Sequence, residues 1–206
     1  MNERKNKLQR DEDFSLIKAF LGNSNDRAAF NKLVLKYRDS VYNLCYRLLG
    51  DYDEANDCAQ EIFIKVFSNL KTFKFGSSFS TWLYRISVNT CKNNISSLSS
   101  RMKKKAVSLD CPLPVNESSW ERNPGIKAGD NSFNPEKLYE KKERETIIQN
   151  AVDSLKSREK ILIVLRDIEN KSYEEIVSIT GLNMGTVKSR LARARQELRE
   201  KLTGVM

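Results

Sequence analysis

The sequence predicts an all-α protein with two small helical domains joined by a flexible linker. Apolar residues recur at three- and four-residue steps within 14–100 and again within 138–206, which is the period of amphipathic helices. No stretch of useful length alternates apolar and polar residues, so no sheet is expected. Segment 101–137 holds all four prolines and has no helical period, as expected of a linker, and 1–13 is a basic N-terminal tail.

In the first domain, one long apolar stripe ends at Gly50. Asp51 and Glu54 have the spacing of a capping box, which predicts that a second helix begins there. Gly and Ser within 73–79 predict a turn, and a third helix is expected from about Ser80.

A helix should begin at Asn134 and Pro135, just before the second domain at 138–206, because a cap followed by proline is typical of a helix start. Further on, Ser172 and Glu175 form another capping-box pattern, and Gly181 suits the left-handed turn that ends a helix. The pattern predicts a short helix between these positions.

A last helix follows, with Asn183 as its expected cap. Its apolar stripe is Val187, Leu191, Ala194 and Leu198, and its opposite face carries Lys188, Arg190, Arg193 and Arg195. A short helix, a turn with glycine and a basic second helix are typical of a DNA-binding helix-turn-helix. An ordinary helical hairpin with a solvated basic face is the simpler interpretation.

The net charge of +9 is concentrated at the chain ends. The segments carry +3 (1–10), +1 (11–100), +2 (101–137), −1 (138–182) and +4 (183–206). Such clustering is expected of a protein that binds the phosphate backbone of nucleic acids.

The chain has no histidine, which excludes Ser–His and Cys–His nucleophiles and removes the commonest metal ligand. The four cysteines, Cys45, Cys58, Cys91 and Cys111, form no C-x-x-C pair, so neither a zinc knuckle nor a thioredoxin-like motif is present. We expect reduced thiols, with Cys45 and Cys58 in the core, and no metal, cofactor or catalytic residue. Whether any of the four has a redox role stays open.

No apolar segment follows the charged start MNERKNKLQR, and the longest apolar run, 161–165, is too short to span a bilayer. A cytoplasmic protein without membrane insertion is expected.

Two sets of motifs resemble extracytoplasmic-function (ECF) sigma factors, the small promoter-recognition subunits of the sigma-70 family. Segments 155–159, 172–176 and 185–195 resemble region 4 of that family. Segments 48–51, 57–63 and 79–90 resemble region 2. The resemblance implies that 14–100 is the region 2 helical bundle and 138–206 the region 4 helix-turn-helix.

In that family, region 2 binds the clamp of core RNA polymerase. The resemblance implies a polymerase-binding helix over 53–67, with contacts from Asp53, Asp57, Gln60 and Glu61. Spacing alone would favour a generic solvated acidic face. Asn56 departs from the family, which usually has an acidic residue there.

Region 2 of the family also melts the −10 promoter element, and taking a base out of its stack costs a few kcal/mol. The residues implied for −10 binding are Phe73, Phe75, Phe79, Arg85, Asn89 and Lys92, whereas Trp82 is expected in the core. Phe75 stands where the family often has glycine, which leaves open whether Phe73 or Phe75 lines the pocket for the extruded base.

Region 4 of the family reads the −35 element as duplex and contacts the polymerase flap. The residues implied for −35 binding are Thr186, Lys188, Ser189, Arg190, Ala192, Arg193 and Arg195. Ala192 can offer only a methyl contact. Arg190 and Arg195 could contact either the bases or the backbone.

The resemblance thus implies a non-enzymatic initiation subunit. Its partners would be core RNA polymerase (clamp and flap), promoter DNA both duplex and single-stranded, and an anti-sigma factor. Two alternatives remain at this point: a stand-alone helix-turn-helix regulator that binds duplex DNA without polymerase, and a helical scaffold protein that binds no nucleic acid.

Overall fold

The computed structural model describes residues 2–22, 27–106 and 135–203, and within these ranges it consists of helices and short connections without a strand. The helices are α1 (Asn2–Gly22), α2 (Arg27–Leu49), α3 (Tyr52–Asn69), the 3₁₀ turn η1 (Leu70–Thr72), α4 (Phe79–Ala106), α5 (Pro135–Asp153), α6 (Ser157–Ile163), the π-helical turn η2 (Val164–Ile168), α7 (Tyr173–Thr180) and α8 (Met184–Thr203). The all-α prediction is confirmed. Most of the expected linker, with Cys111, lies outside the described residues.

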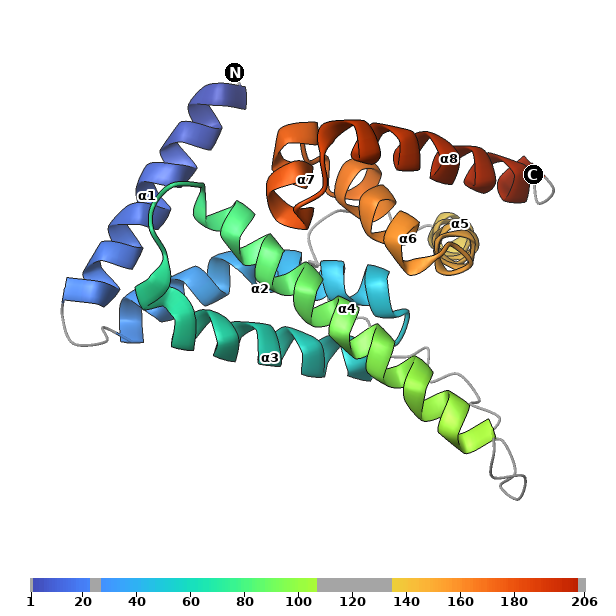
Figure 1. Ribbon diagram of the computed structural model, residues 1–206, viewed down its shortest axis with the longest axis horizontal. Coiled ribbons are helices and arrows are strands. Elements are labelled where there is room, and N and C mark those ends of the chain that lie inside the picture. The colour runs from blue at the N-terminus through green and yellow to red at the C-terminus, as the bar shows by residue number, and fades with distance from the viewer. Residues whose placement is uncertain (1, 23–26, 107–134, 204–206) are drawn as a thin grey trace.

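Helices α1 to α4 form the first unit, and α2, α3 and α4 share its core (Figure 1). The apolar stripe expected before Gly50 faces inward on α2: Leu33, Tyr37, Val41, Leu44, Cys45 and Leu48 are all buried. The expected third helix starts at Phe79, one residue before the expected position.

Helix α1 crosses the boundary expected between residues 13 and 14. Asp13 is buried, and it accepts hydrogen bonds from the Tyr37 hydroxyl (2.5 Å) and from Lys36 Nζ (2.7 Å), both on α2. A buried carboxylate requires hydrogen-bond partners, and both partners of Asp13 belong to α2. The end of the expected tail is therefore part of the first unit.

Helix α4 likewise continues to Ala106, past the expected linker start at residue 101. In the sequence, Leu98, Met102 and Ala106 continue the apolar spacing of α4 at four-residue steps. The basic residues clustered within 101–105 hide this short continuation. At the other side of the linker, α5 begins at Pro135 as predicted.

Two glycines at helix ends have left-handed backbones. Gly50 (φ +82°) ends α2, and a Cβ built on it would lie 3.2 Å from a carboxylate oxygen of Asp153. Gly181 (φ +71°) ends α7 and donates its N–H to the Val177 carbonyl. Both positions favour glycine because a side chain is strained at positive φ.

Helices α5 to α8 form the second unit, and its predicted caps are present. The Ser172 hydroxyl accepts from the Glu175 N–H (3.1 Å), and Glu175 accepts from the Ser172 N–H (2.8 Å), which completes the capping box. Asn183 Oδ1 accepts from the Thr186 N–H (2.8 Å) at the start of α8.

The cap predicted in the first unit is also present. Asp51 Oδ1 caps α3 by accepting from the Glu54 N–H (2.9 Å).

The second unit lies against α2 and α4 of the first (Figure 1). The buried Lys160 of α6 donates to the carbonyl of Leu48 (2.7 Å) and to Asp153 (2.6 Å). Gln149 of α5 accepts from Arg47 Nη1 (3.0 Å). These polar contacts join the two units at the end of α2. No helix among the described residues is long and apolar enough to cross a membrane.

Candidate nucleic-acid interface

Helices α7 and α8 form the predicted helix-turn-helix. Val187, Leu191 and Ala194 are buried and hold α8 against the rest of the second unit. The opposite face of α8 is exposed, and it carries Lys188, Ser189, Ala192 and Arg193. Four of the seven residues expected at the −35 element thus share one accessible face of α8.

The other three expected residues are less free. Thr186 and Arg190 are half-buried. Arg195 makes a two-pronged ion pair with Asp167 of η2, with Nη2–Oδ1 at 2.5 Å and Nε–Oδ2 at 3.1 Å. The Asp167 carboxylate raises the pKa of the Arg195 guanidinium by hydrogen bonding to it. This pair uses the Nε–Nη2 edge of the Arg195 guanidinium and leaves three of its five N–H groups for other partners.

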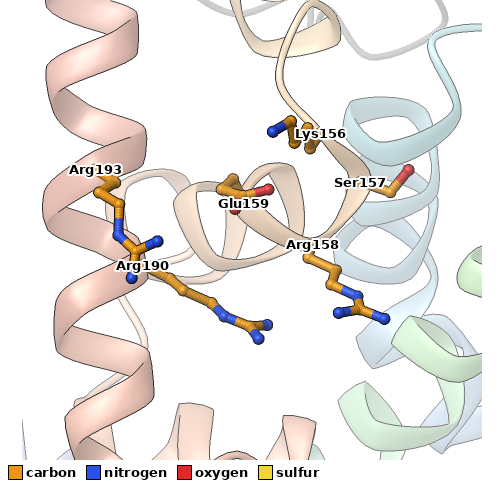
Figure 2. A pocket seen from close by; sticks show the side chains of 6 residues that line it. All are labelled: Lys156, Ser157, Arg158, Glu159, Arg190 and Arg193. Atoms are coloured by element: carbon orange, nitrogen blue, oxygen red, sulfur yellow. The ribbon is translucent and has the colours of Figure 1, made fainter.

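A hollow of about 480 Å³ lies between the start of α6 and the basic face of α8. Figure 2 shows the side chains that line it, with Arg158 on α6 and with Arg190 and Arg193 on α8; the full lining is Lys156, Ser157, Arg158, Glu159, Arg190 and Arg193. Four of the six are cationic, so the hollow suits a phosphate-bearing backbone. The structure thereby adds Lys156 and Arg158 to the expected contacts. The motif at 155–159 contained both, but its sequence gave no indication that they face α8.

In the first unit, a cluster of aromatic rings surrounds the loop between η1 and α4. The ring centroid of Phe73 lies 5.0 Å from that of Phe75, 6.2 Å from Phe79 and 5.4 Å from Trp82. Phe73 and Phe79 are buried, whereas Phe75 and Trp82 are half-buried. Of the aromatic residues expected at the −10 element, Phe75 is therefore the most accessible.

Phe75 adopts a left-handed backbone, with φ of +56°. This conformation is unusual for a bulky residue, and it explains why glycine suits the position. The ring packs edge-on against Phe14 of α1, with centroids 5.1 Å apart.

Helix α4 leads away from this loop and carries the other residues expected at the −10 element. Arg85, Asn89 and Lys92 are all exposed, and their spacing of four and three residues places them on one face of α4. The structure thus brings a cationic and amide-bearing face to the helix that starts beside the aromatic loop.

Helix α3 presents the expected acidic face. Asp53, Asp57 and Gln60 are exposed, whereas Glu61 is half-buried. Glu61 pairs with Lys65 (2.7 Å) and accepts from Asn94 of α4 (3.5 Å). Its hydrogen bond with Lys65 lowers the pKa of the Glu61 carboxyl.

Ile64 continues the same face, and 67% of its surface is exposed. It lies one turn beyond Gln60 and outside the buried stripe of α3. The sequence itself contains a signal for this residue, because Ile64 is apolar and out of phase with that stripe. Phe67, three residues further along α3, is 38% exposed, so two neighbouring apolar side chains are exposed at this point, where a single one would be ordinary.

Comparison with known proteins agrees with both halves of this description. Residues 33–101 match the family Sigma-70 region 2, and residues 145–198 match Sigma-70, region 4. The chain is 36% identical to the ECF RNA polymerase sigma factor SigW of Bacillus subtilis (strain 168), over 86% of this chain and 90% of the relative. It is 35% identical to the ECF RNA polymerase sigma-E factor of Escherichia coli (strain K12), over 86% of this chain and 88% of the relative.

A solved structure shares the fold: the sigma factor RpoE in complex with the anti-sigma factor NepR from Bartonella quintana. It is 24% identical, with a TM-score of 0.59 over 84% of this chain and 96% of that chain. The sequence relatives match both units in one continuous alignment, in the same order. This chain therefore belongs to the family of ECF RNA polymerase sigma factors.

Proposed function

We propose that this protein is a transcription initiation subunit that binds core RNA polymerase and directs it to promoters with two spaced elements. One observation supports the proposal: the chain exposes two surfaces of different chemistry, each of which suits DNA. One is the basic face of α8, and the other is the Arg85–Asn89–Lys92 face of α4 beside the aromatic loop. A regulator that binds only duplex DNA has no use for the second surface.

The basic face of α8 is suited to reading the −35 element as duplex. An exposed helix can enter the major groove, where arginine pairs with two acceptors of guanine. Arg193 is the candidate for such a contact because it is exposed at the edge of the hollow. Lys156 and Arg158 would then hold the adjacent backbone.

The loop before α4 is suited to a base taken out of the duplex at the −10 element. Stacking on an aromatic ring contributes about 1–3 kcal/mol per base, which offsets the cost of extrusion. Phe75 is half-buried, whereas Phe73 is buried within the cluster. We therefore assign the stacking role to Phe75 and a supporting role to Phe73, with Asn89 contacting the base.

The exposed face of α3 is suited to binding the polymerase clamp. Asp53, Asp57 and Gln60 supply charge and polarity, and Ile64 supplies an apolar centre. Apolar residues ringed by polar ones are typical of interface cores. In this role the phosphodiester chemistry belongs to the polymerase, and the protein works in the cytoplasm. A separate anti-sigma factor as regulator is part of the same proposal.

Run-off transcription with purified core polymerase and a library of genomic fragments tests the function. We expect discrete transcripts only when the protein is present. Tight binding to duplex DNA without association with core polymerase would instead support the stand-alone regulator.

Two variants separate the surfaces in the same assay. Asp57→Ala on α3 should weaken binding to core polymerase, whereas Asp39→Ala, an equally exposed acidic position on α2, should not. Asn89→Ala should slow promoter opening in a permanganate footprint and leave −35 duplex binding unchanged. Normal opening by Asn89→Ala would remove Asn89 from the proposed pocket.

A further inference from the structure

Three cysteines far apart in the sequence meet in the core of the first unit. Cys45 on α2, Cys58 on α3 and Cys91 on α4 are at most 1% exposed. The sulfur of Cys91 lies 3.7 Å from that of Cys58 and 3.7 Å from that of Cys45. All three sulfurs lie within 4.8 Å of one another, so one atom placed among them could contact all three.

These distances suit a bound ion. Sulfurs about 2.3 Å from a tetrahedral zinc lie about 3.8 Å apart along an edge, so ligation would require little movement of the helices. The same distance also suits thiols that pack as small apolar groups, which is the simpler role of buried cysteine. The number of sulfurs favours an ion site over simple packing, because packing does not need a second or third thiol at the same point.

The surroundings favour a neutral complex. Lys65 lies near Cys91, because it donates a hydrogen bond to Thr90, and it already pairs with Glu61. Three thiolates around a divalent ion would leave a net negative charge in the core, and a buried charge without a partner is costly. Three thiolates around a trivalent ion carry no net charge.

We propose that Cys45, Cys58 and Cys91 form a three-thiol site for a soft, three-coordinate ion, specifically trivalent arsenic. Arsenous acid would form three As–S bonds and release three molecules of water. Each departing hydroxide takes the proton of one thiol, so the reaction needs no oxidant or reductant. Bonds to α2, α3 and α4 at one atom would also cross-link the three helices that make up this core.

Entry of the ion would require movement of polar side chains beside Cys58. Cys58 lies next to Asn94, a half-buried residue of α4 whose amide also reaches Glu61 on α3. Movement of these two polar side chains would expose Cys58 first, and the other two thiols could then bind in turn.

The reduced full-length protein titrated with sodium arsenite tests the proposal, with native mass spectrometry to count bound arsenic. We expect one arsenic per chain and a rise in the melting temperature. Because the three thiols are buried, iodoacetamide is added in a urea concentration that unfolds the arsenite-free protein, and peptide mapping compares samples with and without arsenite. Cys45, Cys58 and Cys91 should be alkylated without arsenite and protected with it, whereas Cys111 should be alkylated in both. Absence of binding, or protection of only two thiols, or protection that includes Cys111, would overturn the proposal.

Single variants give a second measurement. Cys45→Ala, Cys58→Ala and Cys91→Ala should each lower the affinity for arsenite at least tenfold, while Cys111→Ala should not change it. Helical circular dichroism identifies the variants that fold, and full affinity in any folded core variant would contradict the site. Zinc serves as the divalent control, and tighter binding of zinc than of arsenite would overturn the choice of a trivalent ion.

Discussion

The Tyr84 hydroxyl on α4 donates a hydrogen bond of 2.5 Å to the Glu169 carboxylate, which follows η2 in the other helical unit. Lys171 adds a cation–π contact, with its Nζ 4.0 Å from the centre of the Tyr84 ring. Tyr84 is buried, so its hydroxyl requires a partner. This single side chain therefore couples the region 2 unit to the region 4 unit.

Tyr84→Phe should weaken this coupling and leave each unit folded. The ring and its contact with Lys171 remain, and the hydrogen bond to the charged acceptor is lost, which costs about 1.5–3 kcal/mol. Urea unfolding measures the loss, and the mean radius in small-angle scattering should not change, because the contacts of Lys160 and Gln149 with the first unit remain. Tyr52→Phe, at an exposed position, is the control. Unchanged stability would show that the bond does not help to hold the units together.

Alkaline pH should have a similar effect on the unaltered protein. Burial and the hydrogen bond to Glu169 raise the pKa of Tyr84 above its ordinary value of 10.0. The stability that the neutral phenol provides is complete below pH 10 and is lost as the pH rises from 10 toward the raised value. Thermal unfolding across this range should show the decline, and Tyr84→Phe should make it shallower. Burial also raises the pKa of Tyr42 to about 12, so part of the decline should remain in that variant.

Most of the helices could be predicted from the sequence, because local chemistry determines where a helix begins and ends. Ser172, Gly181 and Asn183 have the predicted capping roles, since each acts on residues within one turn. The start of α1 could not be predicted, because residues 2–13 are almost all polar and have no apolar stripe. In α4 the spacing of Leu98, Met102 and Ala106 was a usable signal, although basic residues surround it.

Contacts between distant residues were not predictable. Tyr84 and Glu169 are 85 positions apart, and Arg195 and Asp167 are 28 apart on different helices. The three core cysteines likewise lack any metal-ligand spacing in the sequence, and only the packing of three helices brings them together. A candidate site assembled by tertiary packing therefore needs the structure, whereas the faces of α3, α4 and α8 follow from helical period alone.

Arg193→Ala and Arg195→Ala should affect −35 binding differently. Arg193 is exposed at the hollow, and its loss should cost about 1–3 kcal/mol if it contacts a base edge in two places. Arg195 is held by Asp167, so its loss should cost less. Fluorescence anisotropy on a cognate and a scrambled duplex measures both. Equal weakening by Arg193→Ala on the two duplexes would identify a phosphate contact instead.

Phe75→Gly should leave the region 2 unit folded while impairing promoter opening. Glycine removes the strain of a left-handed backbone, about 1–2 kcal/mol, which offsets part of the lost packing of a half-buried ring. Phe73→Gly is the matched control: Phe73 is buried and has an ordinary φ of −69°, so its loss should cost about 3–5 kcal/mol with no compensation. Urea unfolding compares the two variants, and permanganate reactivity of the −10 element reports opening. Equal destabilisation by both would contradict the strain at Phe75, and normal opening by Phe75→Gly would contradict its stacking role.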